Sequence, residues 1–261
     1  MCRLAAYIGP EPKPLSALLY EPPHSLEHAS YAPQELLHGH VNVDGTGAAW
    51  WQDEGEAPLR YVTEKPPWSD PNLPVLAPTI LGSPMLAAVR GATPGVGFGS
   101  DNVAPFVSDR WVGVHNGWIG RFRTGVGRSL IAGLSDKRFS ELSTINDSLV
   151  LFLMTVDRLA SGLSVSEAVI EVVEAAAKIV LAADQSATLN LVVASSDEIV
   201  AARTSVNQGV NSLYTLEDDG FWIASEPLDP DQPWQPVPED SLVRATRSSL
   251  TITPLSHQGT S

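Results

Sequence analysis

The sequence predicts an α+β fold in which runs of strands flank two central helices. Strand-like segments dominate the first and last parts of the 261-residue chain. Between them, apolar residues recur at helical spacing from Asp147 to about Leu159 and from Val165 to Leu181. Because strands and helices are segregated along the chain rather than alternating, layered α+β packing is favoured over βαβ units. We expect one domain over residues 1–261, with a core at 2–250 and a tail at 251–261.

The first third of the chain predicts strands separated by proline-rich connections. The apolar run from Cys2 to Gly9 ends at Gly-Pro and predicts a buried first strand. Residues 10–38 predict loops with a short helix near Ala32–His38. The Asp44–Gly47 segment predicts a turn into a strand that carries Trp50 and Trp51.

The proline-rich stretch 63–78 predicts an extended connection, either a lid or an insertion, before a helix or strand at 79–90. A further strand is expected at Trp111–His115, ending at Asn116-Gly117. Ser164 is the expected N-cap of the second long helix. Four more strands are then expected: Thr188–Ala194, Ile199–Ala202, Ser212–Leu216 and Phe221–Ala224. The segment from Ser248 to Ser261 has room for one more strand and a polar end.

Composition and charge narrow the class of protein. A hydrophobic content of 43% with 18% charged residues is typical of a folded soluble protein, and no apolar run reaches membrane-spanning length. The net charge of −14 disfavours a nucleic-acid partner, because phosphate binding depends on clustered basic side chains. A single cysteine excludes an internal disulfide and a cysteine-based zinc site, and it fits a reducing, cytoplasmic setting. We expect no metal, no cofactor and no membrane partner.

That single cysteine, Cys2, follows the initiator methionine directly. If Met1 is removed, one residue carries both a thiol nucleophile and an α-amine that is partly neutral near pH 7 and can act as its base. The alternative is that a small residue merely happens to follow Met1.

Three other places offer groups that such a nucleophile needs. The Asn116 amide and the Gly117 N–H can form an oxyanion hole, although Asn-Gly is also a common hairpin turn. Arg90, with Thr93 nearby, can grip a carboxylate, or it can form an ordinary ion pair. Asp147 can bind an ammonium group, or it can cap a helix.

Taken together, these residues resemble the class II glutamine amidotransferase family of N-terminal nucleophile hydrolases. The landmarks occur in the family's order: Met1-Cys2, Asp44-Gly45-x-Gly47-x-x-Trp50-Trp51, Arg90-Gly-Ala-Thr93, Asn102-x-x-Pro105-Phe106, His115-Asn116-Gly117, Asp147-Ser148 and Ala224-Ser225-Glu226-Pro227-Leu228. The resemblance implies a four-layer αββα sandwich with the nucleophile on the first strand.

The resemblance also implies a role for each matching residue. Cys2 is the nucleophile, and Asn116 with Gly117 forms the oxyanion hole. Arg90, with Thr93 beside it, holds the α-carboxylate of a glutamyl group, and Asp147 holds its α-amino group. We expect His115 to be structural, because an amine base is already present.

Two motifs depart from the common family pattern. Many relatives have histidine where this chain has Ala104, and glutamate where it has Leu149. The Ala-Pro-Phe variant resembles the branch that hydrolyses a γ-glutamyl amide during ergothioneine biosynthesis.

That branch implies a stand-alone hydrolase that releases glutamate from γ-glutamyl hercynylcysteine sulfoxide through a glutamyl thioester, with no protein partner required. Trp118 is the expected pocket wall for the trimethylammonium group of this substrate, and Trp50 and Trp51 are expected in the core. Two other functions remain open: a glutaminase subunit that supplies ammonia to a separate synthetase, and a non-catalytic binding protein with the same fold.

Overall fold

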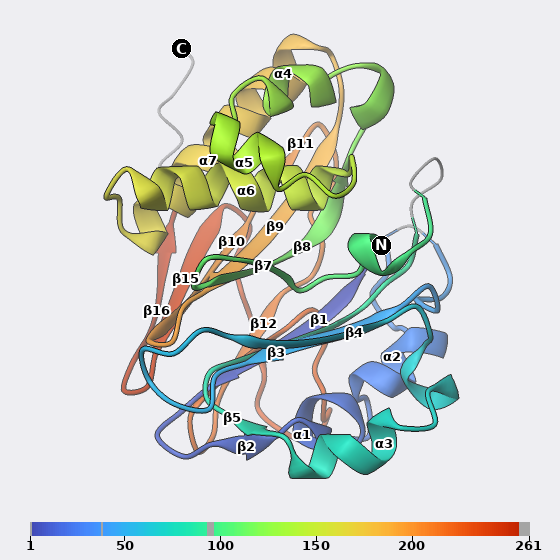
Figure 1. Cartoon of the computed structure of the whole chain (residues 1–261). Coiled ribbons are helices and arrows are strands. Elements are labelled where there is room, and N and C mark those ends of the chain that lie inside the picture. The colour runs from blue at the N-terminus through green and yellow to red at the C-terminus, as the bar shows by residue number, and fades with distance from the viewer. Residues whose placement is uncertain (1, 38, 93–96, 256–261) are drawn as a thin grey trace.

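The computed structural model describes residues 2–37, 39–92 and 97–255. It is a mixed α/β fold built on two antiparallel sheets, as Figure 1 shows. The first sheet has the strand order β14 (Gln235–Pro236), β12 (Tyr214–Glu217), β13 (Phe221–Ala224), β1 (Arg3–Ile8), β6 (Met85–Val89), β3 (Thr46–Trp50), β4 (Leu59–Thr63). The second has the order β16 (Leu250–Pro254), β15 (Ser241–Thr246), β10 (Glu198–Arg203), β9 (Ala187–Ala194), β8 (Trp111–Ile119), β7 (Phe106–Ser108), with β11 (Ser205–Val206) beside β9.

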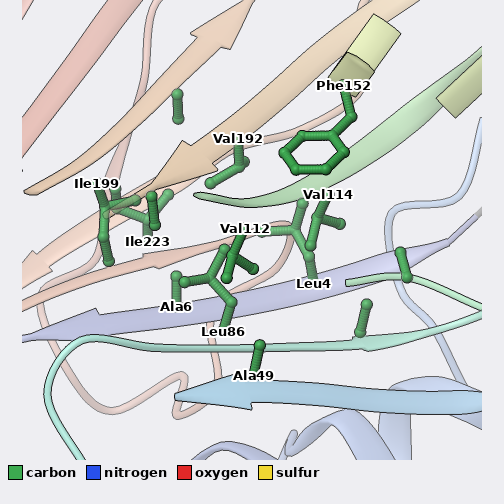
Figure 2. Packing of buried hydrophobic residues seen from close by; sticks show 14 of the residues in the cluster. Leu4, Ala6, Ala49, Leu86, Val112, Val114, Phe152, Val192, Ile199 and Ile223 are labelled. Carbon is green, nitrogen blue, oxygen red and sulfur yellow. The ribbon is translucent and has the colours of Figure 1, made fainter. Parts of the chain in front are cut away.

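The two sheets pack face to face through alternating apolar side chains. Leu4 and Ala6 of β1 share an inward face, because successive side chains of a strand point to opposite sides. They meet Val112 and Val114 of β8 in a buried cluster that also receives Phe152 from the helix layer, as Figure 2 shows. The same alternation places Cys2, which directly precedes β1, on the inward side at the end of this interface.

Two long helices cover the outer face of the second sheet. Helix α6 (Asp147–Ala160) begins at the N-cap Asn146, and α7 (Val165–Ala182) begins at Ser164, where a capping box with Glu167 closes the first turn. Both helices bury an apolar face against β8, β9 and β10. The predicted helices and the predicted Ser164 cap are therefore confirmed. Two short helices, α4 (Gly127–Ile131) and α5 (Asp136–Ser140), lie between β8 and α6 in the chain.

The outer face of the first sheet is covered by short helices from the first third of the chain. These are α1 (Ser16–Leu19), α2 (Leu26–Tyr31) and α3 (Leu73–Leu76), which bury Leu18, Leu19, Leu26 and Leu73 in one cluster with residues of β1 and β6. The small β2 (Lys13–Pro14) and β5 (Leu81–Gly82) pair beside them. The extended connection expected at 63–78 is wrong, because Pro67–Ser69, α3 and Ala77–Thr79 form helical turns there. These turns pack outside the first sheet, where Leu73 and Ala77 are fully buried.

Three other local predictions need correction. The helix expected near Ala32–His38 is instead α2, because the Ser25 hydroxyl accepts the His28 N–H and starts the helix earlier; His38 lies outside the described residues. The strand expected to end at Asn116-Gly117 continues to Ile119, because β9 pairs with it along that whole length. Strand β15 was not expected, although the strand predicted after Ser248 is confirmed as β16.

Among the residues that the structure describes, no helix is both long enough and apolar enough to cross a membrane.

Candidate active site

One pocket gathers the ends of four elements around the single cysteine. Cys2 precedes β1, Arg90 follows β6, Gly117 lies in β8, and Asp147 opens α6. All four line a pocket that encloses about 430 Å³, its open mouth included. The remaining lining residues are Gly91, Asn102, Ala104, Phe106, His115, Asn146 and Ser148. The fold brings Cys2 and Asp147 into one pocket although they are 145 positions apart in the sequence.

Cys2 is a free, half-buried cysteine at the edge of this pocket. Its carbonyl oxygen accepts two hydrogen bonds, one from the Asn116 side-chain amide and one from Arg3 Nε at 2.9 Å. The main chain of the nucleophile is therefore held, while its side chain remains accessible.

Asn116 and Gly117 sit within a paired strand and not in a turn. Asn116 pairs with Asn190 of β9, and its side chain is fully buried on the face that meets Cys2. Its amide carries two hydrogens, so it can hold the Cys2 carbonyl and still offer a second donor. A Cβ at Gly117 would lie 2.0 Å from the Thr188 carbonyl oxygen, so only glycine fits there. The hairpin-turn alternative is therefore wrong.

Arg90 places an incompletely paired positive charge in the pocket. The residue is only 5% exposed, and its Nη2 donates to the Gly97 carbonyl at 2.8 Å. Its Nη1 is buried and has no hydrogen-bond partner among the described residues. A buried donor without a partner is costly, and a bound carboxylate would satisfy it. Thr93, the predicted neighbour of Arg90, lies outside the described residues.

Asp147 supplies the opposite charge from the first turn of α6. The cap of this helix is Asn146, whose side chain accepts the Leu149 N–H at 2.7 Å, so the N-cap alternative for Asp147 is wrong. The Asp147 carboxylate accepts the Ile119 N–H at 2.9 Å and faces the pocket. Asn146 is itself held by Asn102 Oδ1 at 2.9 Å, which ties the start of α6 to the pocket wall.

His115 is buried beneath the pocket and fully engaged. Nε2 donates to the Thr188 carbonyl at 2.9 Å, which leaves Nδ1 as the acceptor for the Ser148 hydroxyl at 3.1 Å. Burial lowers the pKa of His115, and the carboxylate of Asp147 acts in the opposite direction. The ring is thus a neutral brace between β8, β9 and α6, in keeping with the structural role expected for it.

The predicted tryptophans separate into two groups. Trp50 and Trp51 are buried in the core, as expected. Trp118 lies on the same side of β8 as Asn116, with its ring beside Gly120, and it is not one of the residues that line the pocket. Its contact with substrate stays a prediction. Within the described ranges, no group of three His, Cys, Asp or Glu side chains is placed to hold a metal ion.

The sequence reasoning assigned no role to Arg3 and Glu226, which form a buried ion pair beside Cys2. Two features of the sequence could have drawn attention to these residues. Arg3 is a charged residue inside the apolar first strand, and Glu226 belongs to the C-terminal landmark Ala224–Leu228. Neither observation by itself indicates that the two side chains meet.

Comparison with known proteins indicates independently to which family the chain belongs. No protein-family model matches this sequence. The chain is 32% identical over 256 residues to the gamma-glutamyl-hercynylcysteine sulfoxide hydrolase of Mycolicibacterium smegmatis, covering 98% of this chain and 100% of the relative. It is 30% identical to the protein of the same name from Mycobacterium tuberculosis, covering 98% and 97%. Its fold matches a solved class-II glutamine aminotransferase domain protein from Silicibacter pomeroyi with a TM-score of 0.71, 22% identity, and coverage of 97% and 99%.

Proposed function

This chain belongs to the family of γ-glutamyl-hercynylcysteine sulfoxide hydrolases, and from that premise we propose that it hydrolyses the γ-glutamyl amide bond of such a substrate and releases glutamate. The resemblance to class II glutamine amidotransferases predicted from the motifs is confirmed by these relatives and by the shared fold. The chain is accordingly an amidohydrolase.

The observation that carries the proposal is the pairing of opposite charges in one pocket with Cys2. Arg90 offers a buried guanidinium nitrogen that has no hydrogen-bond partner among the described residues, and Asp147 offers a carboxylate. A glutamyl group ends in an α-carboxylate and an α-ammonium, which are the complementary charges. A ligand held at that end extends its γ-carbonyl away from the charged pair, and Cys2 is the only nucleophilic thiol in the chain that can meet it.

The reaction starts once Met1 has been removed. The free α-amine of Cys2 takes the thiol proton, and the thiolate attacks the γ-carbonyl carbon. Asn116 and Gly117 stabilise the resulting oxyanion. The ammonium of Cys2 gives its proton to the departing amine as the C–N bond breaks, which leaves a glutamyl thioester. Water then attacks the thioester while the α-amine of Cys2 takes a proton from it, the thiolate leaves and receives that proton, and glutamate departs.

The proposal extends to the architecture around the site. The two sheets with their outer helices correspond to a four-layer αββα sandwich of the N-terminal nucleophile type, and residues 1–261 act as one domain. We place the protein in the cytoplasm, because a nucleophilic thiol survives best in a reducing compartment. The substrate is a small molecule, and the reaction requires no cofactor, protein partner, nucleic acid or membrane.

The direct test offers γ-glutamyl-hercynylcysteine sulfoxide, glutamine and glutathione side by side and measures released glutamate. We expect the sulfoxide to have the highest kcat/KM by at least about tenfold, a difference of about 1.4 kcal/mol in transition-state binding. Preference for glutamine would instead support the ammonia-supplying glutaminase. No glutamate from any of the three, with Met1 removed, would support a non-catalytic protein.

A further inference from the structure

A buried ion pair next to the nucleophile is not used by the chemistry of the reaction. Arg3 is the first residue of β1, fully buried on the sheet face opposite to Leu4. Its Nη1 lies 3.1 Å from Glu226 Oε1, and Glu226 is almost fully buried as well. Residues 3 and 226 come from opposite ends of the chain, so this contact forms only in the complete fold.

We propose that Arg3 and Glu226 are positioning residues that hold the N-terminal cysteine in its reactive place. The proposal rests on the proposed function, since it takes Cys2 as the nucleophile.

The first step of the argument is the contact with Cys2 itself. Arg3 Nε donates to the Cys2 carbonyl at 2.9 Å, and the Asn116 amide donates to the same oxygen from the second sheet. Two donors on one carbonyl fix the orientation of the Cys2–Arg3 peptide plane, which is rigid. The Cα of Cys2 lies in that plane, so only rotations about Cα–C and Cα–Cβ remain for the amine and the thiol.

The second step concerns the glutamate that holds the arginine. The Glu226 carboxylate also accepts the backbone N–H groups of Gln34 at 2.8 Å and Glu35 at 3.1 Å. The preceding Ser225 exchanges backbone and side-chain hydrogen bonds with Leu4, including Ser225 N to the Leu4 carbonyl at 3.0 Å. These hydrogen bonds fix the position of the Glu226 carboxylate. Because Arg3 Nη1 pairs with that carboxylate, the Arg3 guanidinium is held in place as well.

The third step explains why a free N-terminus needs the hydrogen bonds from Arg3 and Asn116, which we call the clamp on Cys2. A residue in mid-chain is tethered by peptide bonds on both sides, whereas Cys2 keeps only one after Met1 is removed. Strand pairing begins at Arg3, opposite Val89, and does not include Cys2. Within the described residues, the fold therefore holds the main chain of the nucleophile through the Cys2 carbonyl, which accepts hydrogen bonds from Arg3 and Asn116.

The fourth step is energetic. Burying a charged pair costs desolvation that its attraction only partly offsets, and well-packed apolar residues of similar size are often as stable or more stable. Stability alone does not favour Arg3 with Glu226 over an apolar pair. A guanidinium differs from an apolar side chain because its N–H groups point in several directions. The Arg3 side chain can therefore donate to the Glu226 carboxylate and to the Cys2 carbonyl at the same time.

The test compares three variants with the wild-type enzyme, using intact mass to verify that Met1 is removed in each. Arg3→Lys keeps the charge but loses the fork of donors. Arg3→Met/Glu226→Leu replaces the pair by apolar side chains and is expected to fold with a lower Tm, because the Gln34 and Glu35 N–H groups lose their acceptor. Arg138→Lys is the matched control, since Arg138 is another buried arginine, paired with Asp109 and Glu141, that lies outside the pocket lining.

We expect both Arg3 variants to lower kcat by about 100-fold, the size typical of a 1 Å misplacement, while KM changes by less than about threefold. Arg138→Lys should lower Tm and keep kcat. A second readout needs no substrate: Cys2 is the only cysteine, so a protein labelled with ¹³C at cysteine Cβ gives one signal. That signal should be single and narrow in the wild type, and broadened or split in both Arg3 variants.

Wild-type kcat in Arg3→Met/Glu226→Leu, or in Arg3→Lys if the double variant does not fold, would overturn the positioning role. An unchanged cysteine signal in the same variant would do so as well. Failure of the proposed function is a separate outcome, because the wild type itself would then release no glutamate while the cysteine signal still reports the clamp.

Discussion

Replacing Arg90 with methionine is expected to weaken substrate binding while leaving the free energy of unfolding nearly unchanged. The substitution keeps an apolar stem of similar length in a site that is 95% buried and removes the positive charge. In the protein without substrate, it removes a buried Nη1 that has no partner among the described residues, which relieves about 1–3 kcal/mol. It also removes the hydrogen bond from Nη2 to the Gly97 carbonyl, which costs about 1.5–3 kcal/mol. The two effects nearly cancel.

In the complex, the same substitution leaves the substrate carboxylate without its partner. Truncating one side of a buried, hydrogen-bonded charge pair costs about 2–5 kcal/mol. At about 1.4 kcal/mol per tenfold, kcat/KM should fall by about 30-fold to about 4,000-fold, mainly through a higher KM. Urea unfolding of the unliganded protein should give a free energy of unfolding within about 2 kcal/mol of the wild type, the largest difference between the two opposing effects.

The matched control is Arg138→Met. Arg138 is also buried, is paired with Asp109 and Glu141, and does not line the pocket. This variant should lose stability and keep its KM. If Arg90→Met instead left KM unchanged within about threefold, or lost activity only through unfolding, then Arg90 would not hold the substrate carboxylate.

Three further predictions concern the other side of the pocket. Gly117→Ala would place a Cβ 2.0 Å from the Thr188 carbonyl oxygen and 2.3 Å from His115 Nε2, so urea unfolding should show a loss of about 1–3 kcal/mol together with lower kcat; unchanged values would contradict the close packing. Asp147→Asn should raise KM by about 30-fold through loss of the ammonium contact, and an equal loss on a substrate analogue without the α-amino group would argue against that role. Because burial lowers the pKa of His115 below its ordinary 6.5, the unfolded chain binds a proton that the folded protein resists, and stability falls as the pH drops below 6.5. In His115→Gln, urea midpoints measured between about pH 7.5 and pH 5.5 should lose this part of the slope, and an unchanged slope would mean that His115 is not its source.

The parts of the fold predicted well from sequence are those with strong local signals. Helix α7 combines apolar periodicity with a Ser164–Glu167 capping box, and its boundaries follow from these residues alone. The first strand was recognisable because its apolar run ends at Gly-Pro. The extent of β8 was not, since Asn116-Gly117 has a local preference for turns, and only pairing with β9 keeps it extended.

For the site, the sequence indicated which residues could take part, and the structure shows how they are arranged in space. The sequence indicated Arg90 and Asp147 as residues that could bind a carboxylate and an ammonium group. It did not indicate that Asn146, rather than Asp147, caps α6, so that the Asp147 carboxylate can face the pocket. Arg3 and Glu226 each stand out in the sequence, but their pairing was missed because nothing in either local segment indicates a contact across 223 residues. Trp118 was predicted from its place next to Gly117; it lies on the same face of β8 as Asn116, and its contact with substrate stays a prediction.

The measurement that tests the central claim most directly is the intact mass of active protein, alone and acid-quenched during turnover of a γ-glutamyl substrate. The account predicts a chain without Met1 and, in the quenched sample, an added mass equal to one glutamyl group on Cys2. Retention of Met1 in fully active protein, or a glutamyl group on any other residue, would contradict Cys2 as an N-terminal nucleophile.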